Sequence, residues 1–538
     1  MSSASQRSGA GGPSRPNRSI GPVDLWRVGL AIASGLVALA VVTPMFWLFW
    51  QALGVEPARA IELLVSVETA RITLNSLLLT GGVTLLSIAL GVPLAILTTR
   101  TDLPYPRLWT VVAALPLVVP SYIGAIALVG TLGPGGHLEG AFGVALPRVQ
   151  GVWGATLVIT LYTYPYVFLT TRAALLSMDA SLADAARTLN AGRLEAFRRV
   201  TLPQIRPGIA AGALLAALYA VSDFGTPAFL QADVFTSTIY WQFSGFAVEY
   251  AALLAIQLIA IVAVILVIEA GIGRDADASG GVGPGERIRL GRWRWPAMGA
   301  VASIGVLTIL VPLGVFVGWL LRAEGEPVTS LQFSPVFAVN SVRLALLAAV
   351  VACLFALPVA YLSGRTDWLI ARIFERVSYV GFAVPGIVIG LALVFLGTRT
   401  LPSLYRQGVA LLVFAYVIRF LPQAVGTVRS SVLQIEDATI EAARTLDAGR
   451  LETFRRVTAP QLVPGIIAGA VLVFLTTMKE LPMTLLLQPV GMDTLVIIVW
   501  EAQATLNYRY AAIPAILLVC ISGATMVVLL AQEDFGVA

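Results

Sequence analysis

The feature that most constrains this chain is a polar segment that occurs twice within an otherwise apolar sequence. Residues 184–203 read DAARTLNAGRLEAFRRVTLP, and residues 441–460 read EAARTLDAGRLETFRRVTAP. The copies lie 257 positions apart (441 minus 184), close to half of the 538 residues. Around them, about twenty of roughly thirty aligned positions are identical, which indicates a duplicated unit. The sequence therefore predicts two similar halves.

The composition indicates that both halves lie in a membrane. Hydrophobic residues make up 58% of the chain and charged residues 12%, and the mean hydropathy is +0.86. Apolar runs long enough to cross about 30 Å of hydrocarbon recur along the sequence. The formal net charge of +5 comes from arginines that gather between these runs, which favours a role in membrane orientation over nucleic-acid binding. We therefore expect an all-α polytopic membrane protein with the lipid bilayer as a partner and no nucleic acid.

About twelve transmembrane helices are predicted, six in each half. They are expected at 28–50, 74–97, 108–130, 151–171, 208–230, 251–271, 298–321, 340–362, 377–397, 408–425, 465–487 and 510–531. The organisation is then a disordered basic tail (1–27), a first half (28–272), a linker (273–297) and a second half (298–538). An even number of spans before the repeat gives two parallel halves related by a pseudo-twofold axis.

The arginines predict which way the chain crosses the membrane. One set of loops, which includes the tail, the linker and both repeated segments, holds several times more arginines than the opposite set. The positive-inside rule places this set in the cytoplasm. We expect a multi-pass protein of the inner or plasma membrane with both termini cytoplasmic.

Each repeated segment is predicted to form two short helices joined at a glycine. The first helix begins with strong helix formers and an acidic residue, which the helix dipole favours at that end. Gly192 and Gly449 are then expected to adopt the left-handed conformation that ends a helix. Small residues on the first helix would allow close approach by another protein. The paired motif residues are Asp184, Ala185, Ala186 and Gly192 in the first copy and Glu441, Ala442, Ala443 and Gly449 in the second.

These segments resemble the EAA loop of binding-protein-dependent ATP-binding-cassette importers. The likeness consists of Glu-Ala-Ala, a glycine several residues later and a proline before the next span, with Asp184 in place of the usual glutamate in the first copy. Softer similarities to the fused two-half permeases of ferric-iron importers are found in RTDLP at 100–104, SDFG at 222–225, MKELP at 478–482 and DTL at 493–495. Thiamine, sulfate, phosphonate and polyamine permeases share the same scaffold.

The resemblance implies a transmembrane permease that is not itself an enzyme. Its two loops would act as coupling helices on two ATPase subunits, and an extracytoplasmic solute-binding protein would deliver the cargo, ferric iron in the first instance. The sequence contains no Gly-x-x-x-x-Gly-Lys-Ser/Thr phosphate loop, so ATP is expected on the partner subunits and no cofactor or catalytic residue on this chain. An ion-coupled secondary transporter, which also uses repeats and buried charges, is the rival of a different class. A membrane enzyme is disfavoured because the loops hold no nucleophile–base or metal constellation.

Asp223 and Glu480 occupy equivalent positions and are the candidate pathway residues. Each lies about fifteen residues, or roughly 22 Å of helix, from the predicted cytoplasmic end of its span. Helix-breaking residues follow both carboxylates. Charges at this depth normally face a cavity or a partner. They are expected either to line a cation pathway or to form structural ion pairs with Lys479 or Arg419, with any pairing across the halves; the sequence leaves both open.

Other polar and breaking residues receive simpler interpretations. Asn75 and Asn340 begin equivalent spans and are expected to cap them. Pro120 and Pro385 are expected to kink their helices.

The cysteines and the histidine do not predict a metal site. Cys353 and Cys520 are the only cysteines, each within an apolar run, and His137 is the only histidine. We expect no thiol or imidazole metal site.

Overall fold

The computed structural model describes residues 25–132, 149–178, 192–272, 288–321, 333–445, 449–505 and 507–535. These residues are largely helical, and among them the one isolated pairing of extended backbone is a parallel bridge between Thr101 and Ile288. Nine of the described helices are long and apolar enough to cross a membrane, or eleven if each of two sharply bent helix pairs counts as one span. The predicted all-α polytopic fold is confirmed.

The elements follow the same order in the two halves. The first half contains α1 (Leu25–Leu53), α2 (Pro57–Leu64), α3 (Val67–Arg100), α4 (Pro106–Ala114), η1 (Leu115–Val118), α5 (Ser121–Leu132), α7 (Gly151–Ser177), α9 (Arg193–Ala196), η2 (Phe197–Thr201), α10 (Leu202–Ser222), α11 (Gly225–Phe229), α12 (Phe235–Ser244) and α13 (Val248–Ile272). The second half contains α14 (Arg294–Gly305), η5 (Val306–Leu310), α15 (Val311–Leu321), α16 (Pro335–Arg365), α17 (Leu369–Ser378), α18 (Val380–Ala383), α19 (Gly386–Thr400), α20 (Pro402–Gln407), α21 (Val409–Gln434), α22 (Asp437–Thr445), α23 (Arg450–Thr453), η6 (Phe454–Thr458), α24 (Ala459–Met478), α25 (Pro482–Leu487), α26 (Leu495–Ala504) and α27 (Tyr508–Phe535).

Two of the predicted spans are sharply bent pairs of helices. The segment predicted at 108–130 bends by 89° between η1 and α5, and its counterpart at 377–397 bends by 104° between α18 and α19. Pro120 and Pro385 lie at these breaks, immediately before α5 and α19. The predicted kinks are therefore confirmed, and they are larger than a bend within a continuous helix, because proline cannot donate a hydrogen bond to the preceding turn.

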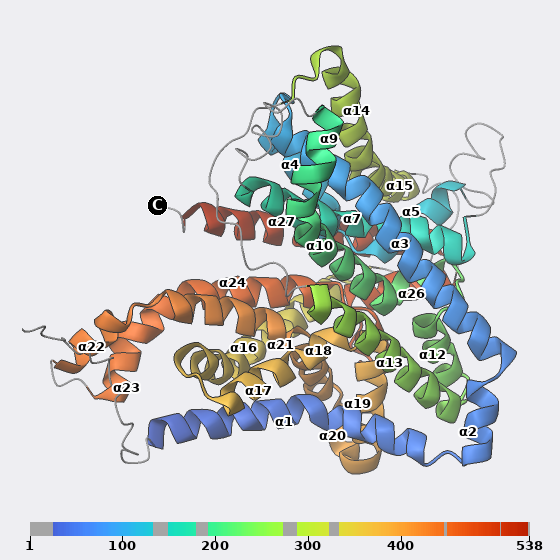
Figure 1. Ribbon diagram of the computed structural model, residues 1–538. Coiled ribbons are helices and arrows are strands. Elements are labelled where there is room, and N and C mark those ends of the chain that lie inside the picture. The colour runs from blue at the N-terminus through green and yellow to red at the C-terminus, as the bar shows by residue number, and fades with distance from the viewer. Residues whose placement is uncertain are drawn as a thin grey trace, which may run out of the picture.

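The first helix of each half packs against the other half. Val41 and Leu48 of α1 belong to the same buried apolar cluster as Ile387 and Leu391 of α19. In Figure 1, α1 runs beside the second-half helices α16, α17 and α19, while α14 stands beside α4 of the first half. This exchange joins the two halves through hydrophobic burial at both edges.

Close helix packing repeats between the halves at equivalent glycines. A Cβ atom on Gly212 of α10 would lie 2.5 Å from the Cα atom of Val167 in α7. A Cβ atom on Gly469 of α24 would lie 3.1 Å from the Cα atom of Ala424 in α21. Small residues allow helix backbones to approach closely within a membrane. The helices α10 and α24 are thereby held firmly up to the points where they break.

Candidate functional site

The helices that carry the two candidate carboxylates end just before or at them. The first, α10, ends at Ser222 and α11 begins at Gly225, so Asp223 lies in the break. The second, α24, ends at Met478 and α25 begins at Pro482, so Glu480 lies in the equivalent break. The hydroxyl of Thr236 donates to the main-chain carbonyl of Asp223 at 2.7 Å and thus satisfies one freed backbone group. The predicted interruptions of both spans are confirmed.

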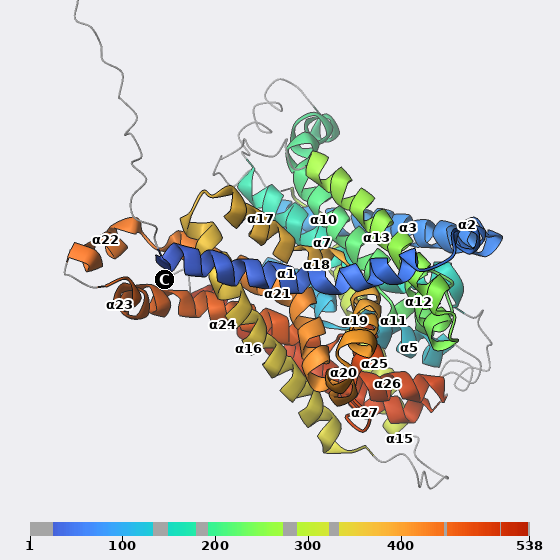
Figure 2. The ribbon, with the colours of Figure 1, turned by 90° about the horizontal axis from the view of Figure 1, so that it is seen from below.

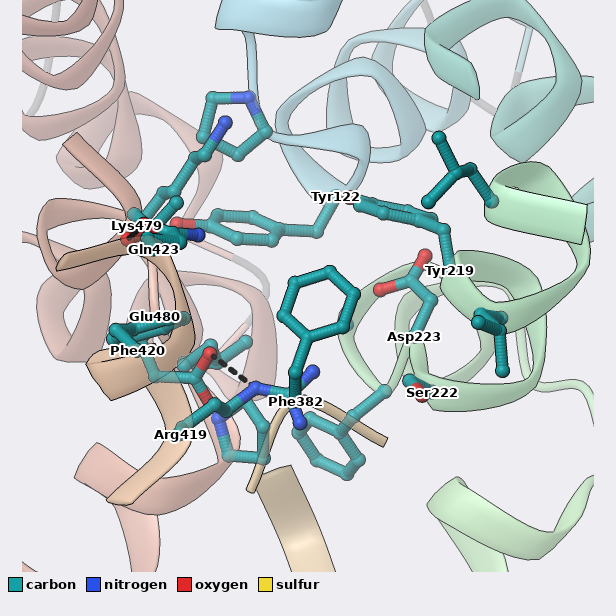
Figure 3. Close-up of a pocket in the computed structure, with 18 of the residues that line it drawn as sticks. Tyr122, Tyr219, Ser222, Asp223, Phe382, Arg419, Phe420, Gln423, Lys479 and Glu480 are labelled. Carbon is teal, nitrogen blue, oxygen red and sulfur yellow. Dashed lines mark hydrogen bonds and ion pairs between the residues drawn. The ribbon is translucent and has the colours of Figure 1, made fainter. Parts of the chain in front are cut away.

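The two breaks face one cavity of about 180 Å³ between the halves (Figure 3). All four predicted pathway residues line it: Asp223, Arg419, Lys479 and Glu480. The ring of Phe382 stands between Asp223 and Glu480 in this view. The structure thus brings together residues that are up to 257 positions apart in the sequence.

The second-half face of the cavity is charged. The guanidinium of Arg419 lies 3.8 Å from Oε2 of Glu480 and also donates to the carbonyl of Val384. The other carboxylate oxygen of Glu480, Oε1, is buried without a hydrogen-bond partner among the described residues. The Nζ atom of Lys479 donates to the carbonyl of Leu117 at 3.1 Å.

These contacts correct the predicted ion pairing. The Arg419–Glu480 pair forms within the second half and does not cross to the first. Lys479 does make a contact across the halves, but its partner is the main-chain carbonyl of Leu117, near the break at Pro120. A broken helix leaves carbonyl groups that need a donor, so a lysine can be anchored there without a carboxylate.

The first-half face is built from hydroxyl groups. The Oδ2 atom of Asp223 accepts a hydrogen bond from Ser121 at 2.9 Å, and the Oγ atom of Ser121 lies 3.1 Å from the hydroxyl of Tyr219. The hydroxyl of Tyr122 is buried without a hydrogen-bond partner among the described residues. Asp223 is thus held by neutral donors, and no basic side chain in the described part of the chain forms an ion pair with it.

Sequence reasoning missed several cavity residues that simple spacing could have found. Tyr219 precedes Asp223 by four residues and Gln423 follows Arg419 by four, so each shares a helix face with a predicted residue. Tyr122 follows the break at Pro120 by two residues. Phe382 carries no such signal, because it reaches the cavity through the bend between α18 and α19.

A group of aromatic side chains joins the halves beside the cavity. This aromatic cluster consists of Phe224, Phe229, Tyr240, Trp241 and Trp500. The ring of Trp500, from the second half, lies 5.4 Å from Phe224, 5.3 Å from Phe229 and 5.4 Å from Tyr240 of the first half. Tyr240 and Trp500 are each the sixth residue of their helices, α12 and α26. Equivalent residues therefore meet where the two halves touch.

The predicted caps at Asn75 and Asn340 are wrong. Both residues lie inside long helices, α3 and α16. Their side-chain amides donate to the carbonyls of Asp233 and Asp493, each at 3.0 Å. The following serine in each copy accepts from the first N–H of α12 or α26. The Asn-Ser pair thus holds the start of α12 or α26 against the long helix through hydrogen bonds. The sequence of one span does not indicate such a contact with another helix.

The second repeated segment forms an exposed pair of short helices. The residues Glu441 and Ala442 lie exposed on α22. In Figures 1 and 2, α22 and α23 project from the other helices on the side where α1 begins. The equivalent residues Asp184, Ala185 and Ala186 lie outside the described residues.

The glycine of each segment starts the second short helix. The carbonyl of Gly192 accepts from the N–H of Ala196, and that of Gly449 accepts from the N–H of Thr453, each at 2.8 Å. Each glycine thus occupies the N-terminal capping position of the second short helix, where glycine is favoured. The expected left-handed conformation stays a prediction, because it depends on residues 191 and 448, which lie outside the described residues.

No group of three or more His, Cys, Asp or Glu side chains in the described part of the chain is arranged to hold a metal ion. Cys353 and Cys520 are both free.

Comparison with known proteins finds the same family twice along the chain. The family described as "binding-protein-dependent transport system inner membrane component" matches residues 87–274 and again residues 356–533. The chain is 30% identical over 500 residues to the Fe(3+)-transport system permease protein FbpB 2 of Haemophilus influenzae, covering 91% of this chain and 95% of that protein. It is 24% identical over 459 residues to the ferric transport system permease protein FbpB of Actinobacillus pleuropneumoniae, covering 80% and 66%. The molybdenum transport system permease protein ModB of Mycobacterium tuberculosis is 32% identical over 199 residues, 36% of this chain and 69% of that protein.

Proposed function

Because this chain belongs to the family of binding-protein-dependent transport system inner membrane components, in which it is a permease of ATP-binding-cassette importers, we propose that its cargo is ferric iron. The observation that carries this choice of cargo is the 30% identity to an Fe(3+)-transport permease over nearly the full length of both chains. The likeness to ModB covers only 36% of this chain, which makes molybdate the weaker candidate.

The cavity chemistry supports an ionic cargo. Fe³⁺ is a hard cation that prefers oxygen ligands. Asp223, Glu480 and Tyr122, whose side chains carry oxygen donors, all line the same cavity. Transport also requires binding weak enough for release. A few separated oxygen donors satisfy this need better than a closed coordination shell.

The cavity is small, which favours a bare or lightly liganded ion over a large chelate. Its volume is about 180 Å³, whereas sites for drug-sized ligands occupy about 300–1,000 Å³. Arg419 and Lys479 offset the two carboxylates, so the lining is close to neutral when all four groups are charged. An ion that enters with oxygen-rich ligands would then meet both acceptors and donors.

The repeated segments are proposed to couple ATP hydrolysis in the ATPase subunits to transport. The exposed small residues of α22 offer a surface that an ATPase subunit can approach closely, and the first segment supplies the same residue types. Two such surfaces imply two ATPase subunits for each copy of this chain, with ATP bound there and not here. Both termini are predicted to lie in the cytoplasm. An extracytoplasmic binding protein would dock on the opposite side of the membrane.

Uptake by the reconstituted complex tests this proposal. The permease, its ATPase and its binding protein are placed in proteoliposomes, and accumulation of radioactive ferric iron is compared with that of molybdate. We expect uptake of iron that requires both ATP and the binding protein. Uptake of molybdate alone would replace the cargo, and uptake driven by an ion gradient without ATP would support a secondary transporter instead.

A further inference from the structure

A second cavity between the halves lies beside the cavity lined by Asp223 and Glu480, which we call the translocation cavity after its proposed role. The second cavity is almost entirely apolar. It has a volume of about 650 Å³. Its first-half wall comes from α10 and α13, and its second-half wall comes from α17, α18 and α21. The apolar lining residues are Leu215, Leu218, Ile259, Val262, Ala263, Leu266, Val380, Phe382, Ala383, Val384 and Pro422. We call this the interhalf pocket.

Water is a poor occupant of the interhalf pocket. Buried water needs two to four polar partners. The pocket offers three polar side chains, those of Arg376, Tyr379 and Gln423, which are too few for the many waters that about 650 Å³ would hold. Ala263, Val380 and Phe382 of the apolar lining are exposed, and Ala263 lies on α13, which is long and apolar enough to cross a membrane. Hydrocarbon from the surrounding bilayer matches both the lining and the location.

An arginine without an ion pair marks one end of the pocket. Arg376 is exposed near the end of α17 and forms no ion pair or side-chain hydrogen bond with another described residue. The nearby charges are already engaged: Glu375 pairs with Arg429 at 3.0 Å, and Arg372 pairs with Asp367 at 3.3 Å. Basic groups between transmembrane helices recognise anionic lipid head groups.

A tyrosine beside this arginine fits the same position at the membrane surface. Tyr379 follows Arg376 by three residues and lines the same pocket. Tyrosine is enriched where the hydrocarbon meets the head groups, because its ring is apolar and its hydroxyl is polar. The first-half position that corresponds to Arg376, 265 residues earlier, is Val111, so the basic end belongs to one half only.

The interhalf pocket shares walls with the translocation cavity. Leu215, Leu218, Phe382 and Gln423 line both. An acyl chain in the pocket would therefore contact the opposite side of residues that face the cargo. It would also fill space between α13 and α18, which belong to different halves.

From these contacts we infer that the interhalf pocket binds one anionic phospholipid, with an acyl chain among α10, α13 and α18 and its phosphate at Arg376. The bound lipid supports the packing of the two halves around the translocation cavity. Both statements are independent of which ion the permease carries.

Lipid retention by the purified permease–ATPase complex tests the inference. The complex is exchanged into nanodiscs of phosphatidylglycerol and phosphatidylcholine, extracted in mild detergent, and analysed for bound lipid by native mass spectrometry. Arg376→Gln removes the charge, and Arg376→Lys restores it. Ala263→Trp fills the pocket. Arg372→Gln is the matched control, because it removes another exposed arginine of the same helix that does not line the pocket.

We expect Arg376→Gln to lower phosphatidylglycerol retention several-fold, with recovery in Arg376→Lys and no change in Arg372→Gln. Ala263→Trp should lower the retention of both lipids. If that variant fails to assemble, Leu266→Trp takes its place. Retention equal to wild type in Arg376→Gln, an equal loss in Arg372→Gln, or full retention in the filled-pocket variants would each overturn the inference.

Discussion

The two faces of the translocation cavity come from equivalent parts of a duplicated chain, yet their chemistry differs. On the first-half face, Asp223 is held by the hydroxyl of Ser121, which also lies beside Tyr219. On the second-half face, Glu480 lies against the guanidinium of Arg419. One carboxylate is held by neutral donors and the other lies beside a partly buried cation. Duplication has kept the position of the acid while its partners have diverged.

The repeated segments show the opposite behaviour. They remain nearly identical over their length, and even the unusual π-helical turns recur, at 197–201 and 454–458. A partner made of two identical subunits favours two identical surfaces, whereas an ion passing along the axis meets both cavity faces at once. The difference between the faces and the segments is what we expect if two identical ATPase subunits bind the segments and the cargo passes through the cavity.

The largest expected effect on ATP-driven uptake is at the segments, where both copies should be equally sensitive. Ala442→Trp or Ala185→Trp should each disrupt ATPase docking, although the other copy is intact. Overpacking of a close interface costs about 1–3 kcal/mol, which corresponds to about fivefold to 150-fold weaker binding. Co-elution with the ATPase and ATP-driven uptake measure this effect, with Ala442→Ser as the small-residue control. Loss in only one of the two variants would break the equivalence of the copies.

The cavity carboxylates should respond unequally. Glu480→Gln leaves the partly buried Arg419 without its counter-ion. Breaking a fully buried pair costs about 3–5 kcal/mol, and this pair should cost less because Arg419 keeps its bond to the carbonyl of Val384. Asp223→Asn removes no counter-ion, because neutral donors surround this residue. The midpoint of thermal unfolding of the purified permease should fall markedly in the first variant and little in the second. Both variants should slow iron uptake.

A double variant distinguishes a pathway role of Glu480 from a purely structural one. Arg419→Met combined with Glu480→Gln removes both charges together, so much of the lost stability should return. If Glu480 contacts the cargo, uptake should remain low although stability recovers. Recovery of both properties would show that the pair is structural only.

The sequence could predict the breaks but not the contacts across them. Asp223 and Glu480 were recognisable from the repeat and from the glycine and proline residues beside them, and Tyr219 follows from helical spacing. The bond from Lys479 to the carbonyl of Leu117 joins residues 362 positions apart. The packing of α1 on the second half is equally hidden, because apolar periodicity predicts which face is buried and not which helix covers it.

In the aromatic cluster, we expect a smaller difference between the effects of equivalent substitutions in the two halves. Trp500 contacts four first-half rings, whereas its equivalent Tyr240 contacts Phe224, Trp241 and Trp500. Replacement of a packed Trp by Ala costs about 3–5 kcal/mol. Because Trp500 contacts more rings of the other half, Trp500→Ala should weaken the contact between the halves more than Tyr240→Ala. Passive leakage of a small dye from proteoliposomes, measured without ATP, reports this opening. Trp500→Phe, which keeps an aromatic ring, is the control, and equal leakage from both alanine variants would contradict the inequality.

We expect the smallest effect at Asn75 and Asn340, where the two halves form equivalent contacts. Asn75 and Asn340 each donate one hydrogen bond of 3.0 Å to the carbonyl before an equivalent helix. A single hydrogen bond contributes about 0.5–1.5 kcal/mol, so replacement of either residue by alanine should cost about 1 kcal/mol. Asn340 is only 8% exposed, whereas Asn75 lies closer to solvent, where water can replace the lost donor. The Asn340→Ala variant should therefore lose slightly more stability, with Asn75→Asp and Asn340→Asp, which keep the shape but lose the donor, as paired controls. A large cost at only one site would mean that divergence between the halves extends from the cavity into the supports of α12 and α26.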